Sequence, residues 1–176
     1  MTARTIPLLL AALAGLVASP SLALSQTAEP VTVFVVRHAE KGPENPDPSL
    51  TDVGQARARA LAEMLKDARV SRVFVSQFKR TQETGQPLAE RLGVALSTVD
   101  ARDVAGLVGT LKALPAGTRA LVVSHSNLVP AIVKGLTGQD VGELTEADYD
   151  RIYVASVPPS GPGGVLYLHF GAPAGH

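Results

Sequence analysis

A continuous run of six strand-forming residues, 31–36 (VTVFVV), leads directly into an arginine and a histidine, Arg37 and His38. Unbroken apolar or β-branched runs are typical of parallel sheets, in which both faces of a strand are buried. In open α/β sheets ligands bind beyond the carboxyl ends of such strands. The run therefore predicts a buried strand that delivers two basic side chains to a candidate site.

Strand-like and helix-like segments then alternate along the chain. Strands are predicted at 72–76, 94–99 and 118–124, and helices at 51–68, 78–93, 103–114 and 127–136. The segments 151–157 and 164–170 flank a Pro/Gly-rich turn, which predicts a hairpin. This alternation predicts one α/β domain: a three-layer sandwich with a mostly parallel central sheet and helices on both faces.

Two of the predicted helices carry finer signals. Thr51 is suited to cap the first helix, whose apolar face is expected to hold Val53, Ala56, Ala60, Met64 and Leu65. In the second helix Gly93 is a plausible C-terminal stop. Pro87 lies inside that helix and predicts a kink or a restart, because proline lacks the N–H that a helix interior needs.

The N-terminal residues 1–25 have the layout of a secretory signal peptide. A basic start with Arg4 precedes an apolar run of about residues 6–18, and small residues follow. The run is short for a membrane-spanning helix, and an uncleaved membrane anchor is the alternative. We expect a periplasmic or secreted domain at 26–176 that has no stable membrane insertion after cleavage.

Composition excludes several classes of partner. Basic and acidic residues balance at 16 each and aromatic residues make up 4%, which argues against nucleic-acid binding and base stacking. The chain has no cysteine, so disulfides cannot stabilise an exported domain. We expect a monomer that binds no nucleic acid.

Unusual side chains follow three of the four predicted parallel strands. The first strand ends at Arg37 and His38, the second ends at Ser76 with Arg80 four residues further on, and the last ends before His125. If these strands are parallel, all of these residues project from one edge of the sheet. The shared position is the strongest signal in the sequence.

Two arginines and two imidazoles around one point suit a tetrahedral dianion. Arginine binds phosphate oxygens through paired, charge-assisted hydrogen bonds, and helix N-termini add N–H donors. A neutral imidazole in such a cradle can attack phosphorus. The fixed positive groups would stabilise the oxygens of the transition state, so no metal or other cofactor is expected.

Each of these residues also has an ordinary structural explanation. Taken singly, an Arg-His pair is usually a surface feature, a histidine at a strand end is usually structural, and Arg80 would be a solvated helix residue. His169 and His176 share no such position, and we expect structural or tail roles for them. The chain has no nucleotide phosphate loop and no nucleophile elbow. Glu40 could ligate a metal together with His38, but no further ligands follow at a recognisable spacing.

Four segments together resemble the signature segments of the histidine phosphatase superfamily (phosphoglycerate mutase-like). They are VVRHAEK at 35–41, SLTDVGQARARAL at 49–61, VFVSQFKRTQET at 73–84 and LVVSHSN at 121–127. The resemblance implies that His38 is the nucleophile that becomes phosphohistidine. It also implies that Arg37 and Arg80 bind the phosphoryl group, with His125 on the opposite side.

The sequence departs from the family pattern beside the nucleophile. The usual R-H-G is R-H-A here, and the asparagine that commonly follows seven positions after the arginine is Glu44. One phosphate ligand is therefore missing or replaced, with Lys41 as the candidate replacement.

The proton donor is the second departure. The phytase-like branch uses a His-Asp pair, but this chain has His125-Ser126-Asn127, and an amide cannot donate the proton. The other branch takes its acid from the region between Arg80 and His125, where Asp100 and Asp103 are the candidates. Capping of the following helix is the alternative role for both.

The short chain resembles the small phosphatase members of the family, which lack the segments that mutases close over a substrate. We therefore expect an exported, metal-independent phosphomonoesterase of the histidine acid phosphatase type, whose partner is a small phosphorylated substrate. Two alternatives stay open: a protein phosphohistidine phosphatase and a non-catalytic module that binds phosphorylated ligands.

Overall fold

The computed structural model describes residues 28–44 and 46–173, and strands and helices alternate along it. The elements are β1 (Val31–Arg37), α1 (Asp52–Leu65), β2 (Arg72–Ser76), α2 (Lys79–Leu92), β3 (Leu96–Val99), α3 (Val104–Lys112), β4 (Arg119–Ser124), α4 (Val129–Thr137), β5 (Arg151–Val157) and β6 (Gly164–His169). Each predicted strand and helix is present, with ends that differ by a few residues.

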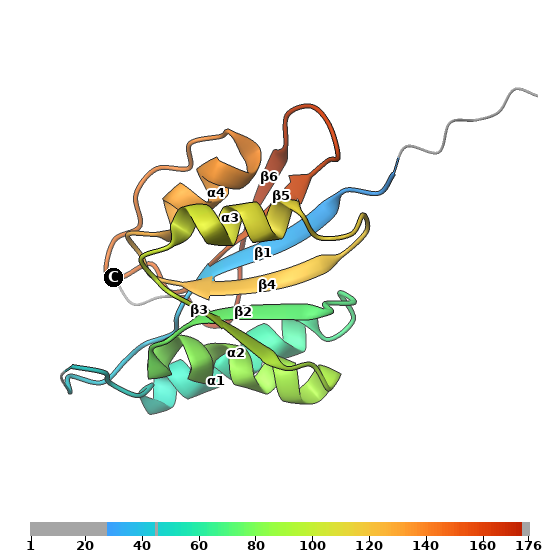
Figure 1. Cartoon of the computed structure of the whole chain (residues 1–176). Helices are drawn as coiled ribbons and strands as arrows, with labels where there is room; N and C mark the ends of the chain where they lie inside the picture. Colours follow the sequence, from blue (N-terminus) through green and yellow to red (C-terminus); the bar gives the residue numbers. More distant parts are fainter. Residues whose placement is uncertain (1–27, 45, 174–176) are drawn as a thin grey trace, which may run out of the picture.

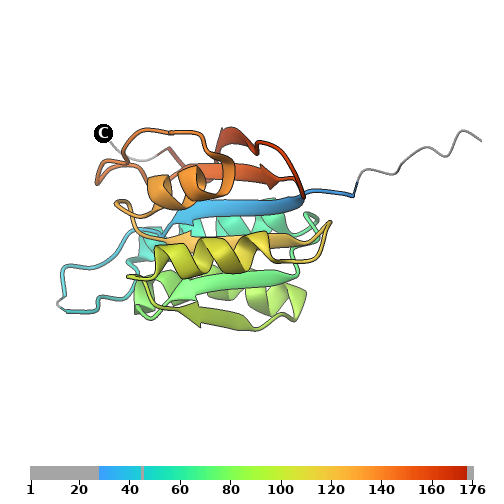
Figure 2. The same cartoon turned by 45° about the horizontal axis from the view of Figure 1, so that its top comes forward.

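The strands form one six-stranded sheet in the order β3-β2-β4-β1-β5-β6. β3, β2, β4 and β1 are parallel, whereas β5 runs antiparallel to both β1 and β6. Helices α1 and α2 cover one face of the sheet, and α3 and α4 cover the other (Figure 1; Figure 2 shows the layers from a second angle). The predicted three-layer α/β sandwich and its late hairpin are confirmed.

The unbroken apolar character of β1 follows from its central position. Val33 and Val35 pack into the cluster under α3 and α4, and Val36 packs into the cluster under α1 and α2. All three side chains are fully buried, and each contributes about 1.5–3 kcal/mol relative to an exposed position. This packing fixes the register of β1 and therefore the place where the chain leaves the sheet.

The buried face of α1 differs from the prediction. Val53 and Met64 are 61% and 42% exposed. The buried residues are instead Gly54, Arg57, Ala58, Leu61, Ala62 and Leu65. The helix turns this face inward because it lies against the chain after β1: a Cβ on Gly54 would stand 2.1 Å from the Glu40 carbonyl oxygen.

The other local signals on α1 and α2 have mixed outcomes. Thr51 caps α1 as predicted, since its Oγ1 accepts a hydrogen bond from the Gly54 N–H at 3.1 Å. Gly93 ends α2 with φ of 66°, also as predicted. The restart expected at Pro87 is wrong, because α2 continues to Leu92. The buried Leu88 directly after the proline anchors the second half of α2 in the core and holds the helix together.

Over residues 28–44 and 46–173, none of the helices combines the length and the apolar character needed to cross a bilayer. The predicted signal peptide at 1–25, the domain start at 26 and His176 lie outside the described residues. Export and the N-terminal domain boundary therefore stay predictions.

Candidate active site

The pairing of β1 with β4 places the two predicted histidines side by side. Arg37 is in register with Ser124, and the His38 N–H donates to the Ser124 carbonyl at 2.9 Å. His38 and His125 are therefore the next residues on neighbouring parallel strands. Their ring centroids lie 5.4 Å apart.

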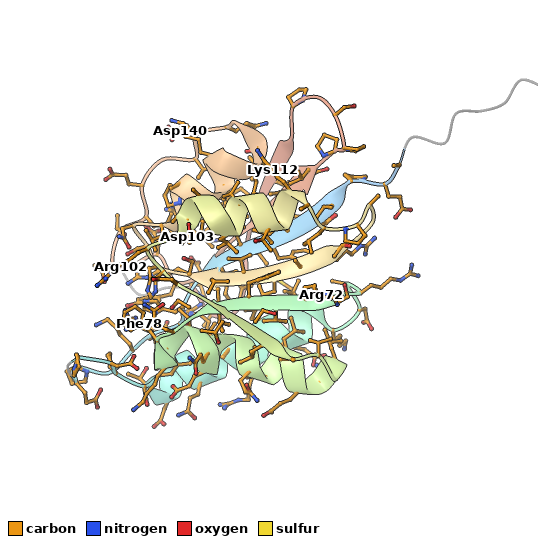
Figure 3. The ribbon with its side chains drawn as sticks, in the orientation of Figure 1. Arg72, Phe78, Arg102, Asp103, Lys112 and Asp140 are labelled. Atoms are coloured by element: carbon orange, nitrogen blue, oxygen red, sulfur yellow. The ribbon has the colours of Figure 1, made fainter. Side chains whose placement is uncertain are left out.

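A pocket of about 400 Å³ opens at this edge of the sheet. Its lining includes the four predicted basic residues, Arg37, His38, Arg80 and His125, together with Lys41, Phe78, Arg102, Asn127 and Glu146. Figure 3 shows Phe78 and Arg102 at the edge where the parallel strands end, whereas Arg72, the first residue of β2, lies at the opposite edge. The expected convergence of the strand ends is thus present in the structure.

The His38 ring is held in one tautomer. Its Nδ1 lies 2.8 Å from the Ala39 carbonyl oxygen, which can only accept, so Nδ1 carries the proton and Nε2 keeps its lone pair. Burial lowers the pKa of His38 from 6.5 to about 3, and the positive charges of Arg37 and Arg80 contribute in the same direction. Near neutral pH the imidazole is therefore uncharged and nucleophilic at Nε2.

His125 is oriented by the end of β2. Its Nε2 lies 3.0 Å from the Ser76 hydroxyl, which is itself 2.9 Å from the Thr81 hydroxyl. Burial lowers the pKa of His125 to about 4, helped by the neighbouring Arg80 and Arg37 charges. The sequence placed Ser76 at this edge but gave it no role, and the structure shows that it positions His125.

Arg37 is buried with 2% exposure and lies against the segment before β5. Its Nη1 donates to the Thr145 carbonyl at 2.9 Å, and its Nη2 donates to Glu146 at 2.7 Å and to the Tyr149 hydroxyl at 3.2 Å. The guanidinium also stacks on the Tyr149 ring at 4.0 Å. Among the described residues, its buried Nε has no hydrogen-bond partner.

Arg80 enters the pocket from the first turn of α2. Its guanidinium stacks on the Phe78 ring at 4.4 Å, and Asp47 lies 3.6 Å from Nη1. Its buried Nε also has no partner within the described part of the chain. The buried Nε of Arg151 also lacks a partner there, but of these three arginines only Arg37 and Arg80 line this pocket, where their free donors are suited to an anion.

The segment after His38 is held by contacts with three other residues. The Ala39 N–H donates to the Thr84 hydroxyl of α2 at 3.0 Å, and the Glu40 carbonyl accepts from the Thr51 N–H at 2.9 Å. The Glu40 carboxylate turns to Arg57, with contacts of 2.7 to 3.0 Å. Glu40 is thus engaged in an ion pair, and the described residues contain no cluster of three or more groups suited to a metal.

The two candidate acids do not line the pocket. Asp103 caps α3 by accepting from the Gly106 N–H at 2.8 Å, and Asp100 accepts from the Arg102 N–H at 2.9 Å. The structure therefore gives both carboxylates the alternative, turn-stabilising and capping roles. His169 lies on β6, where its Nδ1 is 3.0 Å from Asp150.

Sequence reasoning missed Phe78, Arg102 and Glu146 as lining residues. Phe78 and Arg102 follow β2 and β3, so the strand-end rule could have found both. Glu146 belongs to an irregular segment with no periodicity or motif, and no local signal points to it. Lys41, the candidate replacement for the missing ligand, does line the pocket.

Comparison with known proteins agrees with this arrangement. Residues 33–103, which carry β1, His38, Arg80 and the start of the segment before α3, match the family model for the histidine phosphatase superfamily (branch 1). The chain is therefore similar to this superfamily over the segment that contains His38 and Arg80. A comparison with curated protein sequences gives no significant match.

Solved structures resemble this chain over most of its length. The protein histidine phosphatase SixA, solved with tungstate, is 26% identical, and the match covers 78% of this chain and 96% of that one with a TM-score of 0.67. Putative SixA from Nakamurella multipartitia (22% identity, 83% and 99% coverage, TM-score 0.62) shows the same fold. So does phosphoglycerate mutase from Plasmodium falciparum (18% identity, 84% and 94% coverage, TM-score 0.58).

Proposed function

We propose that this protein is a phosphatase in which His38 Nε2 attacks phosphorus and carries the phosphoryl group as a phosphohistidine. One observation carries the proposal: a neutral imidazole with a free Nε2 lone pair lies beside two arginines whose buried Nε donors have no partner among the described residues. Neutral imidazole is the form that acts as a nucleophile. The tungstate in the similar SixA structure is a tetrahedral oxyanion, which supports an oxyanion pocket here.

The other groups have defined parts in this reaction. Arg37 and Arg80 bind the equatorial oxygens of the phosphoryl group, and His125 lies against it from the opposite side. Lys41 adds positive charge at the rim. As the P–O or P–N bond to the leaving group breaks, the new N–P bond to His38 forms; water then attacks phosphorus, releasing phosphate and restoring the lone pair of His38.

The lining of the pocket favours leaving groups that need little protonation. Glu146 is the one carboxylate that lines it among the described residues, and the Arg37 charge holds the pKa of Glu146 below its usual range. His38 and His125 are neutral near pH 7. Neither a carboxylic acid nor an imidazolium is therefore ready to protonate an alkoxide.

This property supports a second candidate function, a phosphohistidine phosphatase. An imidazole leaving group departs from phosphorus far more easily than an alkoxide, and the 26% identical SixA is described as a protein histidine phosphatase. The broader proposal remains an exported, metal-independent phosphomonoesterase. Export rests on the sequence of residues 1–25, and independence from metal rests on the four positive or hydrogen-bonding groups of the pocket.

A substrate panel separates the two functions. Purified 26–176 would be assayed on a phosphohistidine peptide, an aryl phosphate and an alkyl phosphate. We expect turnover of the first two at least about a hundredfold faster than of the third, since a general acid typically contributes 10²–10⁴-fold. Asp100→Asn and Asp103→Asn should leave this ranking unchanged. A fast alkyl phosphatase that either Asp→Asn variant disables would contradict this and restore the aspartate as proton donor.

A further inference from the structure

We propose that Glu146 occupies the phosphate-binding edge of Arg37 in the free protein and must leave it when an oxyanion binds, so that it sets the affinity of the pocket for phosphoryl groups. The inference rests on the proposed function, because it takes Arg37 as a phosphoryl ligand. It identifies a residue that tunes specificity and that no sequence motif marks.

The carboxylate of Glu146 bridges two residues that line the pocket, Arg37 and Ser126. Its Oε2 accepts from Arg37 Nη2 at 2.7 Å, and its Oε1 accepts from the Ser126 hydroxyl at 3.2 Å. Arginine presents the same N–H donors to carboxylates and to phosphates. A phosphoryl oxygen that binds Arg37 Nη2 therefore competes directly with Glu146.

Like charge disfavours the binding of Glu146 and a phosphoryl group to Arg37 at the same time. A carboxylate and a phosphoryl dianion that share one guanidinium repel each other across a few ångströms in a partly buried site. The carboxylate must then swing away or take up a proton. Either change costs free energy that a substrate has to supply, so Glu146 weakens the binding of simple oxyanions.

The rest of the segment is built to stay in place when Glu146 moves. Asp148 accepts from the Thr145 N–H and hydroxyl at 2.6 and 2.7 Å and forms an ion pair with Arg151 at 2.7 Å. Arg37 keeps its bond to the Thr145 carbonyl and its stacking on Tyr149. The guanidinium therefore remains positioned without the carboxylate.

Glu146 itself has freedom to move. Its side chain is 78% exposed, and its described hydrogen-bond partners are Arg37 and Ser126 alone. Glu146 also borders a second hollow of about 580 Å³, which is lined in addition by Val53 and Tyr149. The displaced carboxylate can turn toward this hollow and the solvent without disturbing the core.

The test is the dissociation constant of inorganic phosphate and of tungstate, measured by calorimetry at fixed pH and ionic strength. Glu146→Gln keeps the shape of the side chain and removes its charge, and we expect about 3- to 30-fold tighter binding. The matched control is Glu143→Gln, which removes an exposed charge from the same segment, and its affinity should stay within about twofold of the wild type. Ser126→Ala, which frees one carboxylate oxygen, should tighten binding by a smaller factor than Glu146→Gln.

Three results would overturn the inference. If the wild type binds phosphate and Glu146→Gln binds it equally or more weakly, Glu146 does not limit the affinity of the pocket. The proposed phosphatase function would be unaffected by that result. Equal gains in oxyanion affinity in Glu146→Gln and Glu143→Gln would show that the effect comes from the net charge of the segment and not from the contact with Arg37. If neither the wild type nor Glu146→Gln binds phosphate or tungstate, the proposed function itself fails, and the inference fails with it. A cooperative thermal unfolding transition in each variant would establish that it is folded.

Discussion

Arg37 and Arg57 are both buried, at 2% and 5% exposure, but their surroundings differ. Arg57 binds Glu40 through two nitrogens and donates its remaining Nη1 to the carbonyls of Phe170 and Ala172. Arg37 keeps an unpartnered Nε within the described residues and is paired with a carboxylate that is mostly exposed.

The difference distinguishes a structural arginine from one that we propose to bind a ligand. A buried charge with every donor satisfied joins segments that must not move: here α1, the segment after His38 and the chain after β6. A buried charge with an unsatisfied donor and a displaceable partner retains capacity for a ligand. The sequence alone presents both as an arginine near a candidate motif, and the hydrogen bonds distinguish them.

The largest effect should come from removing the ligand-binding arginine. Arg37→Ala should lower kcat/KM on an aryl phosphate by about 10³–10⁴-fold, or roughly 4–5.5 kcal/mol of transition-state stabilisation. Steady-state kinetics provide the measurement. Relative to the wild type, Arg37→Ala should lose less free energy of unfolding than Arg57→Ala, because the exposed Glu146 is left unpaired at little cost. Activity within tenfold of the wild type would remove Arg37 from the site.

Removing the structural arginine should cost stability. Arg57→Ala leaves the Glu40 carboxylate, 19% exposed, without its partner, and we expect a loss of about 3–5 kcal/mol in the free energy of unfolding. Denaturant unfolding measures it. The double variant Glu40→Ala/Arg57→Ala is the control: it should be more stable than the sum of the single losses predicts, since no unpaired charge remains. Strict additivity would show that the ion pair is not the cause.

A charge-conserving change tests the geometry of the second phosphate arginine. Arg80→Lys should lower kcat/KM by about 10- to 1,000-fold, or roughly 1–4 kcal/mol, because an ammonium cannot reproduce a two-pronged guanidinium contact. Arg102→Lys, at an exposed lining position, is the matched control and should change little. Near-normal kinetics for Arg80→Lys would place Arg80 outside the functional pocket.

The buried histidines make a smaller, pH-dependent contribution to stability. Their folded pKa values of about 3 and about 4 lie below the ordinary 6.5, so between these limits the unfolded chain binds protons that the folded chain does not. Stability is therefore complete above pH 6.5 and falls as the pH drops, by about 2 kcal/mol per histidine at pH 5. Unfolding at pH 7 and pH 5 should show a smaller loss for His38→Ala than for the wild type. An identical loss in both would contradict a neutral, buried His38.

Treatment with a chelator should have the smallest effect. The proposed pocket supplies its positive field from side chains, so dialysis against EDTA should leave kcat/KM within about twofold of the untreated protein. A large loss that added divalent metal restores would instead indicate metal-dependent hydrolysis.

The sequence predicted the fold and much of the pocket because both follow from short-range patterns. Continuous apolar strands identify a parallel sheet, and parallel strands bring Arg37, His38, Arg80 and His125 to one edge. Sequence patterns failed where long-range contacts determine which side chains are buried. Much of the buried face of α1 was misassigned, because part of it is Gly54, which packs against the Glu40 backbone and contributes nothing to an apolar pattern.

Glu146 and the two aspartates show the same limit in the site itself. Glu146 reaches Arg37 from more than a hundred residues away along the chain, through an irregular segment whose path only the fold determines. Asp100 and Asp103 lie in the expected region of the sequence, but their carboxylates accept backbone N–H bonds beside α3. Position along the chain places such residues near a site without directing their side chains into it.

The central claim is that His38 carries the phosphoryl group, and mapping of the covalent intermediate tests it most directly. The protein would be mixed with a fast-reacting phosphoryl donor and quenched in alkali, because phosphohistidine is labile to acid, and its peptides would then be analysed by mass spectrometry. The account predicts one phosphoryl group on His38, absent from His38→Ala and retained in the control variant His169→Ala. A phosphoryl group on another residue, or labelling that survives in His38→Ala, would contradict it.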